Sequence, residues 1–185
     1  MVKILVSGFK PFLGSSVNSS QKIVEMLVGE SLSKVILPVE FEKSFLILDG
    51  IIKNEKPNFV LMLGQASDRK KISLEKIALN WNESIHPDEV GFFTPIGPID
   101  KNNPHLALMT KFPVNLLHDL LISKMNHVEI SFSAGAYVCN NLYFNFLKNY
   151  EDIPALFVHI PLIETLALNI QIDIVQEIIE FIKKN

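Results

Sequence analysis

Three residues whose side chains can perform nucleophilic catalysis stand far apart in the sequence: Glu75, Cys139 and His159. Cys139 follows the turn-forming stretch Ser133-Ala134-Gly135. We expect it in or just before the first turn of a helix, where backbone N–H groups and the helix dipole favour a thiolate. This environment suits a nucleophile. The alternative is a small buried hydrophobic side chain, which is the commoner role of a lone cysteine.

His159 lies near the end of an apolar run, residues 155–160, that is typical of a buried strand. A buried imidazole needs a hydrogen-bond partner, so His159 is either a catalytic base or a core histidine bonded to a backbone carbonyl. Glu75 interrupts another apolar run, residues 72–79. It is either an exposed charge on the solvent face of a strand or the carboxylate that orients the imidazole. The other histidines lack metal-ligand spacing, so we expect neither a metal nor a cofactor.

Two loops after predicted strands are candidates for ligand binding. Gln65 follows the predicted strand 59–63, at the sheet edge where open α/β proteins place their ligands, although the segment could also be a plain turn. The loop 8–14 carries Phe9 and Phe12, which either cover the core or form the walls of a pocket for a flat apolar ligand. This loop lacks the glycine spacing of a phosphate-binding motif.

Strands and helical segments alternate along most of the chain, which favours a parallel sheet covered by helices. Asn18 can cap the first helix. The stretch 71–80 alternates like a strand, and the section that follows, up to residue 104, predicts a hairpin or a long functional loop. We therefore predict a single domain, residues 1–185, with a three-layer α/β/α architecture and a mostly parallel, mixed central sheet. The other predicted strands are residues 2–6, 34–39, 59–63, 128–132 and 155–160.

Composition excludes several classes of protein. The chain has 185 residues, of which 48% are hydrophobic and 20% charged, as in a packed globular protein and unlike a disordered one. Its net charge of -3 and its single arginine, Arg69, argue against a nucleic-acid partner. No apolar stretch approaches the roughly 18 residues of a membrane helix. One cysteine cannot form an internal disulfide and no cleavage-site pattern is present, so we expect a cytoplasmic protein.

Taken in order, these segments resemble the pyrrolidone-carboxylate peptidase family of cytosolic cysteine peptidases, also called pyroglutamyl-peptidase I. The resemblance spans nearly the whole chain. It comprises the opening loop with Phe9 and Phe12, the sequence Val17-Asn18 with Ser20, and the segments 64–80, 133–140 and 157–161. It implies that Cys139 is the nucleophile, His159 the general base and acid, and Glu75 the residue that orients the imidazole. It also implies that Phe9, Phe12, Asn18 and Gln65 bind the substrate.

The resemblance further implies an exopeptidase that acts on small peptides with an N-terminal pyroglutamyl group and that forms a homo-oligomer, often a tetramer. One position departs from the family pattern: a second arginine of the family corresponds to Ser84. Two alternatives therefore stay open. The chain could be a catalytically impaired relative that binds lactams or pyroglutamyl peptides without efficient turnover, or a hydrolase of another small cyclic amide or nucleoside-like compound.

Overall fold

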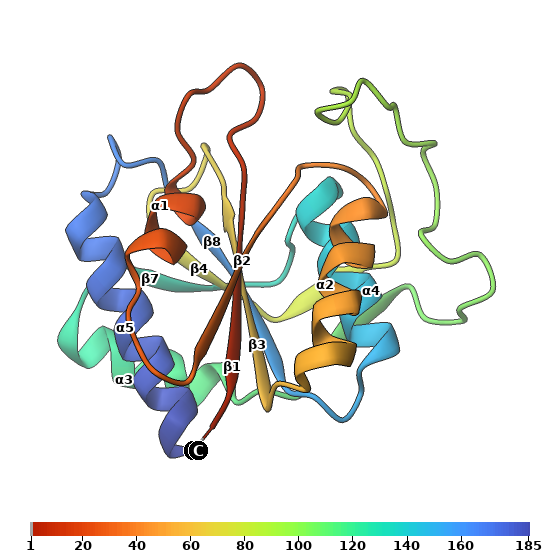
Figure 1. Ribbon diagram of the computed structural model, residues 1–185. Coiled ribbons are helices and arrows are strands. Elements are labelled where there is room, and N and C mark those ends of the chain that lie inside the picture. Colours follow the sequence, from red (N-terminus) through yellow and green to blue (C-terminus); the bar gives the residue numbers. More distant parts are fainter. Residues whose placement is uncertain (1) are drawn as a thin grey trace.

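A six-stranded sheet lies between two layers of helices in the computed structural model, which describes residues 2–185 (Figure 1). The strand order is β2-β1-β3-β8-β4-β7. Neighbouring strands are parallel except β4 and β8, so β4 and β7 run opposite to the other four. The predicted α/β fold with a mostly parallel, mixed sheet is confirmed. The strands are β1 (Ile4–Phe9), β2 (Leu32–Leu37), β3 (Phe59–Gln65), β4 (Ile72–Glu75), β7 (Val128–Ser131) and β8 (Ala155–Ile160).

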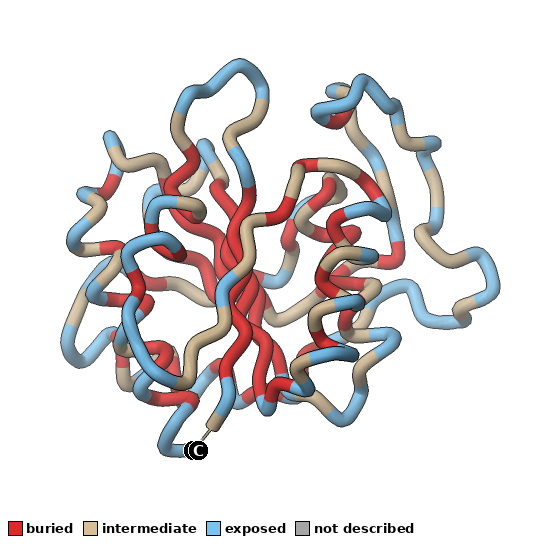
Figure 2. Tube along the Cα trace, in the orientation of Figure 1, coloured by how far each residue is buried: buried red, intermediate tan, exposed pale blue. Residues whose placement is uncertain are grey.

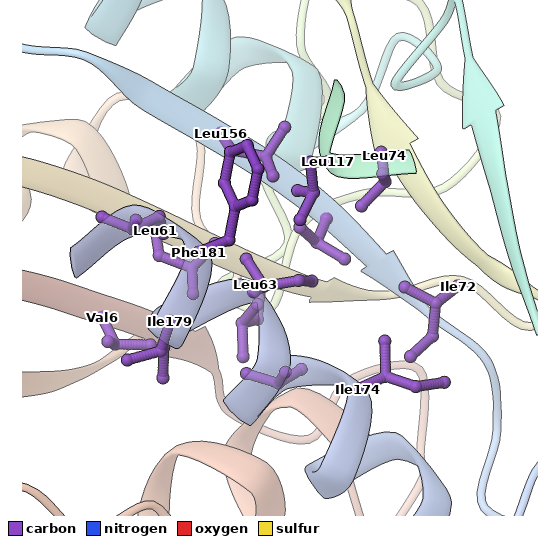
Figure 3. Packing of buried hydrophobic residues seen from close by; sticks show 14 of the residues in the cluster. Val6, Leu61, Leu63, Ile72, Leu74, Leu117, Leu156, Ile174, Ile179 and Phe181 are labelled. Carbon is purple, nitrogen blue, oxygen red and sulfur yellow. The ribbon is translucent and has the colours of Figure 1, made fainter. Parts of the chain in front are cut away.

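The two faces of the sheet are covered by different helices, which are α1 (Ser19–Met26), α2 (Lys43–Glu55), α3 (Val114–Lys124), α4 (Val138–Asn149) and α5 (Leu168–Lys184). Helices α1, α3 and α5 cover one face, and α2 and α4 cover the other. Successive side chains of a strand point to opposite faces, so β3 is buried on both sides. Leu61 and Leu63 pack toward α5, and Met62 packs toward α4. The buried strands run through the centre of the molecule (Figure 2), and Figure 3 shows Leu61 and Leu63 in one cluster with Ile174, Ile179 and Phe181 of α5.

The first strand is longer than the sequence predicts. We expected it to end at Ser7-Gly8, but β1 continues through both residues and ends at Phe9, which is buried. Gly8 explains the difference, since a Cβ atom there would lie 2.8 Å from the carbonyl oxygen of Ser20. The absence of a side chain lets the start of α1 pack directly on the strand. Asn18 caps α1 as predicted, because its side chain accepts a hydrogen bond from the Ser20 N–H.

The predicted strand 71–80 is broken at Lys76. Its first half is β4 of the main sheet, and its second half, β5 (Ile77–Leu79), pairs with β6 (Ala107–Met109) in a separate two-stranded hairpin. The residues between them, 80–106, form a long excursion that we call the arm and that extends from the body of the protein (Figure 1). The middle section is therefore a hairpin with a long connection. Among residues 2–185, no helix combines the length and apolar character needed to span a bilayer.

Candidate active site

The carboxyl ends of β3 and β8 meet at one edge of the sheet. These strands are parallel neighbours, and Gly64 is paired with His159 in their register. Met62 and Phe157, each two residues earlier, belong to the core under α2 and α4. Since strand side chains alternate, the imidazole of His159 and the vacant side-chain position of Gly64 both face α4.

Glu75 reaches the imidazole from the neighbouring strand β4. Because β4 runs antiparallel to β8, Glu75 lies opposite Phe157 and diagonal to His159. The carboxylate is fully buried, and its Oε1 lies 2.8 Å from Nδ1 of His159. A carboxylate can only accept a hydrogen bond, so the Nδ1–H donates and the ring is held in one tautomer. Glu75 is therefore not an exposed charge on the solvent face of a strand. The partner of His159 is a carboxylate and not a backbone carbonyl.

Cys139 is the second residue of α4, as expected from the sequence. The next residue anchors this end of the helix: the Asn140 side chain bonds the N–H and carbonyl of Leu79 and the carbonyl of Trp81, at 2.8 to 3.0 Å. Cys139 is half-buried, and a Cβ atom placed on Gly64 would lie 2.9 Å from its sulfur. The sulfur therefore packs against Gly64, and Gly64 is the β3 residue that pairs with His159 in β8.

The Cys139 thiol does not have the low pKa that its helical position predicts. Burial of the sulfur, reinforced by the negative charge of Glu75, raises the pKa of Cys139 to about 12, although a hydrogen bond from its own backbone N–H favours the anion. Desolvation disfavours the charged form more than the end of the helix stabilises it. At neutral pH the raised pKa favours the protonated thiol of Cys139.

The predicted substrate-binding residues gather around Cys139 and His159. All of them line one cavity of about 190 Å³, together with residues from four further segments. A larger cavity, of about 880 Å³, involves none of the predicted site residues. The lining of the smaller cavity is Phe9, Phe12, Asn18, Val39, Gln65, Ala66, Ser67, Asp68, Ala134, Tyr137, Cys139 and His159.

The two amide side chains in this cavity differ in how fully they are bonded. Gln65 accepts hydrogen bonds from the N–H and the hydroxyl of Ser19, at 2.7 and 3.0 Å, which orients its NH2 group. That NH2 group has no protein partner within residues 2–185 and is free to meet a ligand. Asn18 is committed at both ends: its oxygen caps α1 through Ser20, and its NH2 group donates to the carbonyl of Lys10. It shapes the cavity chiefly by fixing the opening loop.

Comparison with known proteins identifies the family of this chain. The model of the family described as pyroglutamyl peptidase matches residues 2–176. The chain belongs to the pyroglutamyl peptidase family. A pyrrolidone-carboxylate peptidase of Saccharolobus islandicus is 38% identical over 175 residues, covering 91% of this chain and 83% of that protein. One from Thermosipho melanesiensis is 33% identical, covering 86% of this chain and 83% of that protein.

Solved structures of pyroglutamyl peptidases share the fold. The pyrrolidone carboxyl peptidase of Fervidobacterium islandicum superposes with a TM-score of 0.90 at 32% identity, covering 100% of this chain and 99% of that one. The protein from Thermus thermophilus gives a TM-score of 0.86 at 34% identity, covering 94% and 97% of the two chains. The chain thus spans nearly the full length of these family members.

Two features of this family member were not found by sequence reasoning. Arg69 places one guanidinium nitrogen 3.7 Å from the Glu75 carboxylate and donates from it to the carbonyl of Ser133, at 3.2 Å, in the turn before α4. Tyr137, the residue before α4, lines the cavity. The position of Arg69 depends on its contact with Ser133, 64 residues later in the chain. The position of Tyr137 depends on the path of the loop before α4. The only available signal was the position of Arg69 in the family-like segment 64–80.

Ser84, which takes the place of a family arginine, lies on the arm. Its hydroxyl donates to the carbonyl of His86 and does not line the cavity. Within residues 2–185, no lysine or arginine lines the cavity, and no three His, Cys, Asp or Glu side chains are grouped to hold a metal ion. The site therefore offers a thiol, an imidazole bonded to a buried carboxylate, and an amide NH2 group, with apolar walls beside the exposed Ser67 and Asp68.

Proposed function

We propose that this chain is a cysteine exopeptidase that hydrolyses the amide bond after an N-terminal pyroglutamyl residue. The observation that carries the proposal is the alignment of three groups on one face of the sheet. The Cys139 sulfur rests over Gly64, the paired residue His159 is its neighbour, and Glu75 holds the imidazole at 2.8 Å. This order of nucleophile, base and orienting carboxylate is that of a catalytic triad.

The proposed reaction has two steps. As the sulfur of Cys139 attacks the amide carbonyl, its proton passes to His159, which is needed because burial keeps the thiol protonated. The imidazolium then protonates the departing amine as the C–N bond breaks, which leaves a thioester. Water, deprotonated by His159, attacks that thioester and releases free pyroglutamate, and the proton returns to the sulfur. Glu75 stabilises the imidazolium in both steps.

Recognition of the substrate follows from its chemistry. A pyroglutamyl group is a neutral, flat lactam with one N–H donor and one carbonyl acceptor. In our proposal Phe9 and Phe12 supply apolar walls, and the free NH2 group of Gln65 donates to the lactam carbonyl. A peptide with a charged N-terminal amine would have to desolvate that ammonium group, and within residues 2–185 the one carboxylate that lines the cavity, Asp68, is exposed rather than buried. Selection of the lactam over an ordinary N-terminus is therefore expected.

The test is the release of a fluorophore from a pyroglutamyl amide by the purified protein. We expect hydrolysis that depends on Cys139, so that the Cys139→Ala variant gives only background release. A matched substrate with an N-terminal glutamate, which has the free amine, should not be cleaved. Wild-type release no greater than that of Cys139→Ala would contradict the proposal.

One observation favours a second candidate, a relative that binds pyroglutamyl compounds without efficient turnover. The position of a family arginine is Ser84, on the arm, and no cationic side chain within residues 2–185 lines the cavity to stabilise negative charge. Calorimetry with pyroglutamate separates the candidates. Binding without hydrolysis supports the second, and hydrolysis supports the first.

We also propose that the protein is a cytoplasmic homo-oligomer, with four copies as the resemblance implies. The arm supports self-association because it carries apolar side chains that are more than 60% exposed, namely Ile85, Val90, Phe93, Ile96 and Leu106. Patches of this kind are commonly covered by a partner. Light scattering of the purified protein measures the number of copies, and a monomer at micromolar concentration would contradict this part of the proposal.

A further inference from the structure

One short segment of the arm, residues 87–89, is bonded to two residues that line the cavity and to one that follows a lining residue. The hydroxyl of Tyr137 donates to the carbonyl of Pro87, at 2.8 Å. The N–H of Glu89 donates to the carbonyl of Val39, at 3.1 Å, and the Glu89 carboxylate accepts from the N–H of Leu13, at 2.9 Å. Tyr137 and Val39 line the cavity, and Leu13 follows a lining residue. The segment does not line the cavity itself, so it acts through these walls.

The bond to Leu13 holds an unfavourable turn. Leu13 and Gly14 have φ values of 51° and 73°, and the N–H of Ser15 donates to the carbonyl of Phe12. Two positive φ values at the centre of a turn suit asparagine and glycine, whereas leucine avoids this region. Such a conformation persists only where the surroundings fix it. For Leu13, which is exposed, the fixing contact is the Glu89 carboxylate.

The residue before Glu89 is held in place by hydrogen bonds to two other residues. The neighbouring Asp88 is buried, and its carboxylate accepts hydrogen bonds from the N–H groups of Phe41 and Phe92, at 3.1 and 2.9 Å. The Phe41 ring packs edge-on against Tyr137, with ring centroids 5.3 Å apart. Burial, together with the charges of Asp88 and Glu89, raises the pKa of Tyr137 to about 12, so the phenol keeps the proton with which it bonds.

We infer that Glu89 is a positioning residue, whose carboxylate holds the turn at Leu13 and thereby keeps Phe12 at the wall of the cavity. The inference rests on the proposed function, because it concerns binding of the pyroglutamyl group. Glu89 is exposed and lies outside the cavity, so it does not act on the reacting atoms. Its loss should therefore weaken substrate binding and leave the chemistry at Cys139 nearly intact.

The experiment compares three single variants of the full chain. Glu89→Ala removes the acceptor and should raise KM about three- to tenfold, as expected for the loss of one hydrogen bond, with kcat within about twofold of wild type. Glu89→Gln keeps an acceptor oxygen and should restore KM. The matched control is Glu83→Ala, which removes an exposed arm carboxylate that bonds only the nearby indole of Trp81 and should leave KM unchanged.

Hydrogen exchange at the Leu13 amide provides a readout that does not require activity. Exchange should be faster in Glu89→Ala than in wild type, and close to wild type in Glu89→Gln. An unchanged exchange rate in Glu89→Ala would overturn the inference, as would a fall in kcat as large as the rise in KM. If wild type hydrolyses no pyroglutamyl amide, the proposed function fails, and exchange at Leu13 still decides whether Glu89 holds the turn.

Discussion

The two faces of the sheet carry different kinds of side chain. Under α1, α3 and α5, the inward residues of the central strands are almost entirely aliphatic, as in Leu61, Leu63 and Val158. Under α2 and α4, the same strands place Gly64, Glu75 and His159 among the apolar residues toward the carboxyl edge. Both faces are fully covered, so the difference is not one of exposure. Aliphatic packing stabilises the first face, whereas the second includes a buried charge and a vacant side-chain position.

This difference shows how one sheet can serve stability and chemistry at once. Buried polar groups weaken a core unless they are bonded, and one carboxylate oxygen of Glu75, Oε2, has no partner within residues 2–185. The aliphatic face can compensate for that cost through dense packing. Substitutions on the reactive face should therefore change activity more than stability, and substitutions on the aliphatic face should do the reverse.

The largest expected effect is that of Glu75→Gln, which keeps the size of the side chain and removes its charge. His159 loses the anion that stabilises its protonated form, so kcat/KM should fall about 10²- to 10⁴-fold. The melting temperature should stay near that of wild type, because the glutamine oxygen can still accept from Nδ1 of His159 while a buried negative charge is removed. Loss of folded protein in the circular dichroism spectrum would contradict the assignment of Glu75 to chemistry alone.

On the opposite face, Leu61→Ala should destabilise the protein without altering the chemistry. Leu61 is fully buried, and truncating such a side chain leaves a cavity that lowers the free energy of unfolding by about 2–5 kcal/mol. Urea denaturation measures this change. The kcat of the folded variant at a permissive temperature should equal that of wild type, and a parallel loss of kcat would show that the two faces are coupled.

Gly64→Ala tests the contact between the sheet and the sulfur of Cys139, the proposed nucleophile. The added methyl group would lie 2.9 Å from the Cys139 sulfur and 2.8 Å from the Phe157 ring, so one of them must move. We expect a loss of stability of about 1–3 kcal/mol and, if the sulfur moves by about 1 Å, a fall in kcat of about 10²-fold. Wild-type kinetics in this variant would show that the sulfur does not depend on the space over Gly64.

The last prediction changes no residue and concerns the pH dependence of the alkylation of Cys139 by iodoacetamide. Because burial raises the pKa of this thiol to about 12, the thiolate fraction is low at neutral pH and increases as protons are lost. The rate should rise about tenfold per pH unit from about pH 7 to about pH 10, whereas an ordinary thiol levels off above its pKa of about 8.5. A plateau near neutral pH would show that the thiolate is stabilised in the free protein.

Much of this fold was predictable because its central strands are buried on both faces. Every strand of the main sheet appeared as an apolar or alternating run, and Asn18 marked the start of α1. The direction of β4 was not predictable, since it depends on pairing with β7 and β8, which follow more than 50 residues later. The break at Lys76 depends in the same way on pairing between β5 and β6.

The sequence predicts which residues gather at the candidate site, but it does not predict the pKa of Cys139. Each predicted residue lies at the same cavity or, for Glu75, bonds a residue that does. Their roles in catalysis and binding stay predictions. The sequence predicts a lowered pKa for Cys139, whereas burial raises it. The place of Cys139 in a helix is predictable from the sequence, but burial of its sulfur depends on segments that are distant in the chain. The contact of Glu89 with Leu13 joins residues 76 positions apart and has no sequence signature.

The anchoring of Trp81 by Asn140 provides a spectroscopic advantage. Trp81 is the one tryptophan of the chain, its indole is partly exposed, and its carbonyl is bonded to the residue that follows Cys139. Tryptophan fluorescence, excited selectively over that of the three tyrosines, therefore originates from a single known position at the root of the arm. Emission from that ring can follow ligand titration or the mixing of subunits with no engineered label.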